Sequence, residues 1–183
     1  MTSFYAFALL AVMAGVIGSS CGQAQESVHP TLAHTHEEFT FIVRTPYERA
    51  FPLFGGYEER KWAAGFDPQF DHPSPERDQQ GMVFTTEHDG RELVWANTIF
   101  DPATGRVQYV YFVADTMVTL IDIHLAKASA AETRVDVVYE RTALKPEANE
   151  QVEHLAKTDA NSGPEWADAI NEYVTRSSKG AAK

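Results

Sequence analysis

Two short groups of side chains have the types and spacing that a metal site needs. His34 and His36 alternate, so they would share one face if their segment were a strand. The residues that follow do not complete H-E-x-x-H, which needs its second histidine four places after the first. We therefore interpret residues 25–36 as a polar linker that carries incidental histidines.

The second group consists of Asp67, Asp71 and His72, which are close enough in sequence to hold a cation. Pro68 and Pro73 interrupt this stretch, and prolines at such positions are typical of loops. We interpret the group as part of a solvated loop. The sequence thus predicts no metal and no other cofactor.

Catalytic residues are equally hard to assign. The single cysteine, Cys21, precedes the predicted domain, and the chain has no G-x-S-x-G, phosphate-binding loop or dinucleotide fingerprint. His124 alternates with apolar residues and should face outward together with Asp122. Arg141 is in phase with Tyr139 and lies either at a cavity rim or, as we prefer, at an exposed strand end. No acid–base pair can be named.

The N-terminus has the character of an export signal. Residues 1–24 carry no charge, and Phe4–Ile17 is an apolar run of 14 residues, too short for a typical membrane span. Small residues before Gln25 suit cleavage there. Alternatively, Cys21 is a lipidation site, although Gly18 is unusual three places before such a cysteine. We expect a periplasmic or cell-envelope protein; an uncleaved anchor or a misassigned start codon is the remaining alternative.

Composition limits the domain organisation and the partners. The chain has 183 residues, 44% of them hydrophobic, which suits one domain with a sizeable core. We assign the domain to residues 37–176 and a disordered tail to 177–183. The net charge of −11 disfavours nucleic acid and anionic lipid as partners, because their phosphates would repel it. Contact with a membrane is expected only through the N-terminal segment, and the oligomeric state stays open.

Seven segments are predicted to be strands of one sheet. Most of them alternate apolar and polar residues, are rich in β-branched residues and are separated by turn residues. Their spacing of about ten residues is typical of an antiparallel meander. The segments are Glu38–Arg44, Phe66–Phe70, Met82–Glu87, Leu93–Phe100, Val107–Val113, Val118–Leu125 and Thr133–Arg141.

Two short helices are predicted after the first strand. Thr45 and Glu48 have the spacing of a capping box with proline at the first helical position, which predicts a helix start. Pro52 should kink or stop that helix. Tyr57–Ala64 is predicted to form the second helix, which ends at a glycine.

A long, interrupted helix is predicted to close the chain. Glu147–Thr158 is helical in composition, and a second capping box at Ser162 and Glu165 restarts the helix to about Arg176. An apolar stripe follows at helical spacing and must lie on a broad apolar surface: Trp166, Ala169, Ile170, Tyr173 and Val174. The sequence therefore predicts an α+β fold in which a curved antiparallel sheet wraps around this helix.

The chain resembles the START/polyketide-cyclase-like superfamily, also called SRPBCC, which has the helix-grip fold. The resemblance extends over about residues 37–176. It is carried by T-P-Y-E-R-A-F-P-L-F, R-K-W-A-A-G-F-D-P, G-M-V-F-T-T, the segment from Trp95 to Pro102, and the segment from Thr133 to Glu140.

The resemblance implies an apolar cavity between the sheet and the C-terminal helix. Trp62 would lie near the mouth of this cavity. The other implied ligand-binding positions are Phe84, Tyr109, Val135, Val137 and Tyr139 on the sheet and Trp166, Ile170 and Tyr173 on the helix. Aromatic walls with a few phenol groups suit an apolar ligand with one polar end. The same residues would also serve as an ordinary filled core.

Three functions are compatible with these observations. We expect an exported domain that binds a hydrophobic, aromatic or lipid-like small ligand, with no catalytic activity evident. A cyclase or dehydratase is the first alternative, and a cavity residue with a strongly shifted pKa would favour it. A protein-interaction module is the second alternative, and it would require a filled core and an exposed apolar patch.

Overall fold

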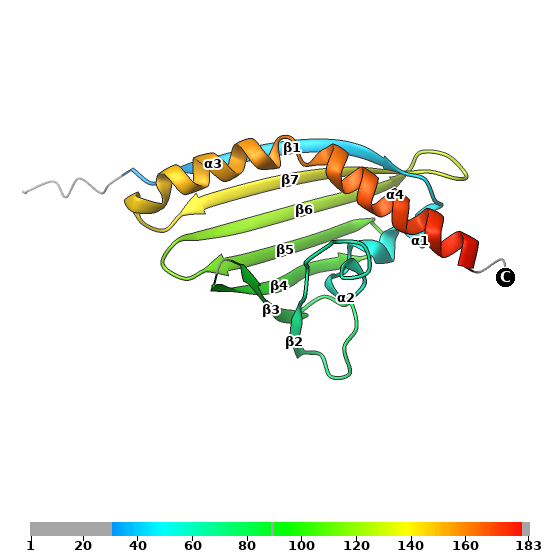
Figure 1. Ribbon diagram of the computed structural model, residues 1–183, viewed down its shortest axis with the longest axis horizontal. Helices are drawn as coiled ribbons and strands as arrows, with labels where there is room; N and C mark the ends of the chain where they lie inside the picture. Colours follow the sequence, from blue (N-terminus) through cyan, green and yellow to red (C-terminus); the bar gives the residue numbers. More distant parts are fainter. Residues whose placement is uncertain (1–30, 89, 181–183) are drawn as a thin grey trace, which may run out of the picture.

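The protein is a single antiparallel sheet with helices on its concave side. A computed structural model describes residues 31–88 and 90–180. The strands lie in the order β1-β7-β6-β5-β4-β3-β2 (Figure 1). Their bounds are β1 His34–Val43, β2 Gln69–His72, β3 Val83–His88, β4 Arg91–Asp101, β5 Arg106–Val113, β6 Met117–Lys127 and β7 Thr133–Ala143. The predicted seven-stranded sheet is confirmed.

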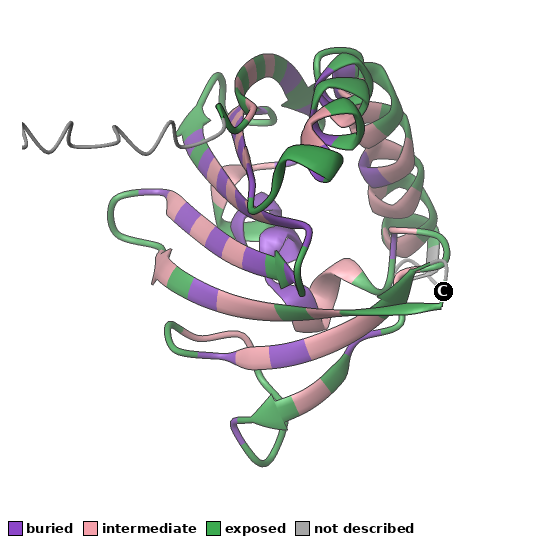
Figure 2. Ribbon diagram, turned by 90° about the vertical axis from the view of Figure 1, so that its left-hand side faces the viewer, coloured by how far each residue is buried: buried purple, intermediate pink, exposed green. Residues whose placement is uncertain are grey.

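The helical segments lie between β1 and β2 and after β7. Their bounds are α1 Tyr47–Ala50, a 3-10 turn at Phe51–Phe54, α2 Gly56–Glu59, a 3-10 turn at Pro146–Ala148, α3 Asn149–Asp159 and α4 Gly163–Gly180. The helix α3 contacts β1 and β7, and α4 contacts β1. Figure 2 shows the sheet curving beneath these two helices. This arrangement confirms the predicted α+β helix-grip fold.

Alternation along the strands determines which side chains enter the core. Val107, Tyr109, Tyr111 and Val113 of β5 are all buried, and the residues between them are more exposed. The same pattern places the isoleucines of β6 inward and His124 outward, as predicted. The stripe on α4 also packs as predicted, because Ile170 is fully buried and its partly buried neighbours contact the core. Amphipathic alternation therefore builds a core between sheet and helices.

Several segment boundaries differ from the sequence expectation; the second predicted helix, for example, ends at Glu59 and not at Ala64. β1 begins at His34, inside the range assigned to the linker, and His36 lies 3.4 Å from the carboxylate of Glu140 on β7. α4 continues to Gly180, beyond the predicted end at Arg176. Strand pairing along the whole of β7 explains the early start of β1, because it gives the backbone of residues 34–36 hydrogen-bond partners.

The two predicted capping boxes are wrong. Ser162 donates its hydroxyl to the carbonyl of Thr158 at 2.9 Å, so it closes the end of α3 and does not cap α4. Helix α1 has no side-chain cap, and Glu48 instead pairs with Lys127 at 2.5 Å. Thr45 is buried, and its carbonyl accepts a hydrogen bond from a threonine hydroxyl on β7. The Ser162 hydroxyl is therefore used locally on the preceding helix, and the Glu48 carboxylate in a tertiary ion pair, instead of in capping boxes.

The cap of α2 comes from a distant residue. Asp78, in the loop before β3, accepts hydrogen bonds from the backbone N–H groups of Tyr57 at 2.7 Å and Glu58 at 3.2 Å. These are donors that the first turn of a helix leaves unpaired. Asp78 thereby fixes α2 against the sheet and sets the direction of the side chains that follow.

No helix within residues 31–88 and 90–180 is both long and apolar enough to cross a membrane. The predicted export signal and Cys21 lie outside the described residues.

Candidate functional site

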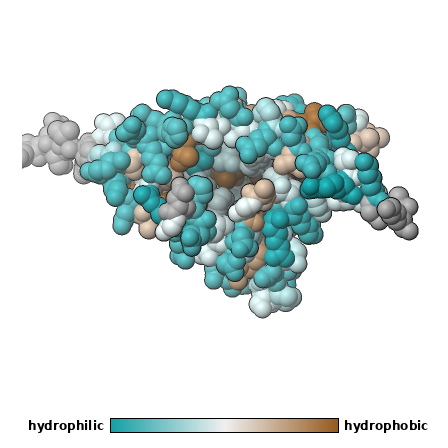
Figure 3. All heavy atoms as spheres, in the orientation of Figure 1, coloured by the Kyte–Doolittle hydropathy of each residue, from teal (hydrophilic) through white to brown (hydrophobic). Residues whose placement is uncertain are grey.

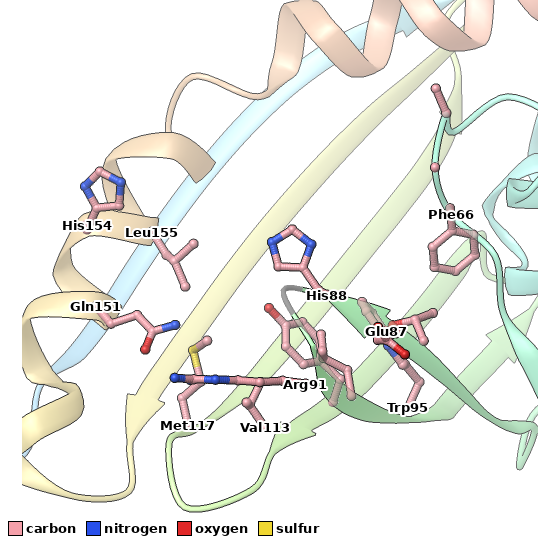
Figure 4. Close-up of a pocket in the computed structure, with 15 residues that line it drawn as sticks. Phe66, Glu87, His88, Arg91, Trp95, Val113, Met117, Gln151, His154 and Leu155 are labelled. Atoms are coloured by element: carbon pink, nitrogen blue, oxygen red, sulfur yellow. The ribbon is translucent and has the colours of Figure 1, made fainter.

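A large cleft opens between the sheet and α3. It has a volume of about 780 Å³. Figure 4 shows its walls: Gln151, His154 and Leu155 from α3, and Trp95, Val113 and Met117 among the residues from the sheet. Apolar side chains are also visible in the hollow on this face of the molecule in Figure 3. The volume lies within the range of small-molecule sites, about 300 to 1,000 Å³.

The cleft has an apolar floor and a polar rim. Its floor includes Leu93, Trp95, Tyr111 and Val113 from β4 and β5, all at least partly buried. Its rim carries Glu87, His88 and Arg91 near the β3–β4 connection, opposite Gln151 and His154 (Figure 4). An apolar body with a polar group at one end is the shape of ligand that such walls accommodate.

A second, smaller chamber lies deeper in the molecule. It has a volume of about 50 Å³ and shares Trp95 with the cleft. All but one of its lining residues are apolar or aromatic: Phe84, Trp95, Tyr109, Ile121, Ile123, Tyr139 and Trp166. The remaining one is Glu59, the last residue of α2. A carboxyl group therefore lies in an aromatic chamber.

Burial gives Glu59 an unusual ionisation. Loss of hydration, together with the nearby charge of Asp78, raises the pKa of Glu59 to about 8. Asp78 is affected in the same way, and burial raises its pKa to about 6 even though the N–H groups of Tyr57 and Glu58 oppose the shift. Removal from water disfavours the charged form of a carboxyl group. Glu59 is therefore largely protonated at neutral pH.

Polar groups on β4 and β5 lie beside this chamber. The Tyr109 hydroxyl donates to the carbonyl of Phe54 at 3.0 Å, and burial raises the pKa of this phenol. Asn97 is 1% exposed, and its amide has no hydrogen-bond partner among the described residues. It lies at the register shift between β4 and β5. Unpaired buried amides are uncommon in cores and are concentrated at functional or strained sites.

A buried ion pair supports the floor of the cleft. Arg141 on β7 and Asp159 at the end of α3 are each 5% exposed and make two hydrogen bonds, at 2.5 and 2.8 Å. Arg141 also donates to the hydroxyls of Tyr111 and Thr119. Although burial opposes its charge, the bonds to Asp159 raise the pKa of Arg141. Our expectation of an exposed strand-end arginine is therefore wrong.

The predicted site residues separate into two groups. The chamber brings together Phe84, Tyr109, Tyr139 and Trp166. The others lie outside both cavities. Val135, Val137 and Ile170 are fully buried core, Trp62 is buried and donates its indole N–H to a carbonyl at 2.7 Å, and Tyr173 lines a shallow surface pocket near α1.

Sequence reasoning missed Glu59, Trp95, Tyr111 and most of the cleft. Trp95 and Tyr111 occupy inward strand positions, so the alternation on β4 and β5 could have indicated them. Glu59 has no such signal, because α2 spans four residues and shows no periodic pattern. Its position depends on how Asp78 anchors α2.

The two groups considered for a metal site and interpreted as linker and loop do not line the cleft or the chamber. His34 and His36 lie on the exposed face of β1, where each contacts a residue of β7. No cluster of three or more histidine, cysteine or acidic side chains suited to a metal ion is found within the described part of the chain.

The sequence matches no protein-family model and no curated protein, but solved structures match the fold. Norcoclaurine synthase from Thalictrum flavum, in complex with dopamine and hydroxybenzaldehyde, has 14% identity and a TM-score of 0.59; the match covers 93% of this chain and 98% of that one. Ara h 8.0201 has 16% identity and a TM-score of 0.57, and the match covers 79% of this chain and 99% of that one. The Zhui aromatase/cyclase from Streptomyces sp. R1128 has 14% identity and a TM-score of 0.56, and the match covers 79% of this chain and 95% of that one. The chain therefore has the helix-grip fold that these solved structures share.

Proposed function

We propose that this protein binds a small, mainly apolar or aromatic ligand in the cleft between α3 and the sheet. The observation that carries the proposal is the cleft itself, about 780 Å³ with an aromatic floor and a polar rim. Structures of the same fold contain small ligands, as in norcoclaurine synthase with dopamine and hydroxybenzaldehyde. An interaction module, the other alternative, would not require a cleft of this size.

Native mass spectrometry tests the proposal. Protein purified from a bacterial host should retain a reproducible small molecule that organic extraction removes. Extracted protein should regain thermal stability with members of a panel of aromatic compounds, sterols and lipids, since a ligand that binds only the folded state stabilises it. A clean apo mass together with no thermal shift from any member would contradict ligand binding.

A proton-transfer enzyme of the cyclase or dehydratase kind is the second candidate. Glu59 favours it, because a carboxyl group with a pKa of about 8 in an aromatic chamber can give or take a proton near neutral pH. The ligand recovered from the protein would be incubated with it in D₂O and followed by NMR. Conversion or deuterium uptake that is lost in Glu59→Gln but kept in Glu58→Gln supports an enzyme. An unchanged ligand supports a carrier.

We further propose that the protein is exported to the periplasm or cell envelope. The support is in the sequence: an uncharged N-terminus with an apolar run at Phe4–Ile17. Mass analysis of the protein from a bacterial envelope fraction tests this proposal. Cleavage before Gln25 would support export with removal of the signal, and a diacylglyceryl group on Cys21 would support export as a lipoprotein. A full-length unmodified chain in the cytosol would contradict both.

A further inference from the structure

The inner chamber is built from aromatic rings, of which Phe84 and Trp95 are stacked at 9° while others stand at steep angles to their neighbours. The ring planes of Tyr109 and Trp95 meet at 80°, those of Tyr109 and Phe84 at 77°, and those of Tyr139 and Trp166 at 82°. The rings therefore lie on several sides of the space, with one stacked pair among them. The faces of such rings carry negative charge density and attract cations.

Beside the chamber lie the Glu59 carboxyl group and the Asn97 amide, which offers both a donor and an acceptor. The carboxyl group of Glu59 has no hydrogen-bond partner among the described residues. The charge that acts on its pKa is that of Asp78, which has the same sign. Tyr109 donates its hydrogen to the carbonyl of Phe54, and its oxygen lies beside the Asn97 amide and the Gly56 N–H, which oppose the rise in its pKa. No lysine or arginine lines the chamber; the Arg141 guanidinium, paired with Asp159, lies 5.0 Å from the centre of the Tyr139 ring.

We propose that this chamber binds the positively charged end of the ligand, an ammonium or small alkylammonium group, with Glu59 as its counter-ion. The proposal rests on the proposed function, because the apolar body of the same ligand would lie in the cleft. Trp95 lines both spaces, so the cleft and the chamber are neighbours on either side of one side chain. The chamber volume of about 50 Å³ suits a group of one or a few heavy atoms, since a water molecule occupies about 30 Å³ in the liquid.

Binding of a cation at Glu59 is coupled to release of a proton. Without a ligand, Glu59 is largely protonated at neutral pH. A cation binds the ionised carboxylate in preference to the protonated form, so its binding displaces the proton. The titratable groups that face Glu59 are Asp78 from the loop, Tyr109 from β5 and Tyr139 from β7. Burial raises the pKa of both phenols, so they stay neutral, and Asp78 titrates earlier, near pH 6. Affinity for a cation should therefore rise about tenfold per pH unit below pH 8 and then level off.

Three probes with the same phenyl body test the charge preference. Calorimetric titration with 2-phenylethylamine, 2-phenylethanol and 3-phenylpropionate compares a cation, a neutral alcohol and an anion. The amine stays protonated to about pH 10, as the lysine side chain does. At pH 8 it should bind about tenfold or more tightly than the alcohol, and the anion should bind most weakly. Titrations in two buffers of different ionisation enthalpy should show about one proton released per amine at pH 7.

Glu59→Gln and Glu58→Gln form the matched pair, because both remove one acidic group and only Glu59 lines the chamber. Glu59→Gln should abolish the preference for the amine and its pH dependence while the alcohol still binds, which also shows that the variant is folded. Glu58→Gln should leave both unchanged. The inference is wrong, and the proposed function stands, if the alcohol binds but the amine binds no more tightly than the alcohol. The same conclusion follows if the amine still binds more tightly than the alcohol in Glu59→Gln. If no probe binds and the ligand panel also fails, both are wrong.

Discussion

Arg141 on β7 and Asp159 at the end of α3 form a two-bond ion pair in the interior, with Nε donating to Oδ2 at 2.5 Å and Nη2 donating to Oδ1 at 2.8 Å. The pair connects the sheet to the helix that forms one wall of the cleft. Because Arg141 also holds the Tyr111 hydroxyl, the pair sets both the position of α3 and the floor beneath it.

Removing one member of this pair should destabilise the protein strongly. Asp159→Ala leaves the Arg141 guanidinium buried and unpaired, which typically costs about 3 to 5 kcal/mol of unfolding free energy. Urea unfolding measures the loss. Asp136→Ala breaks the exposed pair with Arg134 and is the control, with an expected cost under about 1 kcal/mol. Equal, small losses in both variants would show that the buried pair does not anchor α3.

The stability of the protein should fall as pH rises from about 4.5 to 8. Glu59 has a folded-state pKa of about 8 against an ordinary value of 4.5, so the folded state keeps a proton that the unfolded chain releases in this window. Glu59→Gln should remove much of this slope and stabilise the protein at pH 8 by about 2 to 4 kcal/mol. Denaturant unfolding at several pH values measures the effect. A wild-type slope that survives in Glu59→Gln, with Asp78 intact in both, would contradict this assignment.

Much of the fold, and little of the site, could be predicted from the sequence. Alternation of apolar residues identified β5 and β6 correctly, because a strand repeats every two residues whatever its neighbours are. The ion pair of Arg141 could not be predicted, since its partner lies 18 residues away on another element. A strand pattern reports only that a residue points inward, and not which group meets it there.

The capping boxes failed for a related reason. The spacing of Ser162 and Glu165 describes a local option, and the structure uses the serine hydroxyl on the preceding helix instead. Whether the space between sheet and helices is filled depends on how all of their side chains pack together. No short segment of sequence contains that information, so the cleft was left undecided between a cavity and a core.

Gly55 should be required where Asp78 caps α2. A side-chain carbon at Gly55 would lie 2.1 Å from the carboxyl carbon of Asp78. Gly55→Ala should displace that carboxylate from the N–H groups of α2 and reduce stability by about 1 to 3 kcal/mol. Gly163→Ala, where the nearest atom is 3.2 Å away, is the control and should cost less. Thermal unfolding of both variants measures the difference, and a neutral Gly55→Ala would mean that the loop shifts freely.

Tyr111 should donate a hydrogen bond to a ligand in the cleft. Its hydroxyl oxygen accepts from Arg141, and no acceptor for its own hydrogen is found within the described residues. Tyr111→Phe should reduce the preference for acetophenone over ethylbenzene about fivefold, the equivalent of about 1 kcal/mol. Tyr109→Phe is the control, because the Tyr109 hydroxyl is already used on a backbone carbonyl. Competition binding measures the ratio, and an unchanged ratio in Tyr111→Phe would rule out this contact.

The central claim is that the cleft beside α3 holds an apolar ligand, and a blocked cleft tests it most directly. Leu155→Trp fills the cleft from α3, while Glu153→Trp adds the same side chain at an exposed position of the same helix that does not line it. The fluorescence of the neutral probe N-phenyl-1-naphthylamine reports binding. We predict saturable binding to the wild type and to Glu153→Trp, and a loss of at least about tenfold in Leu155→Trp with the fold intact by circular dichroism. Equal binding by all three proteins would contradict the claim.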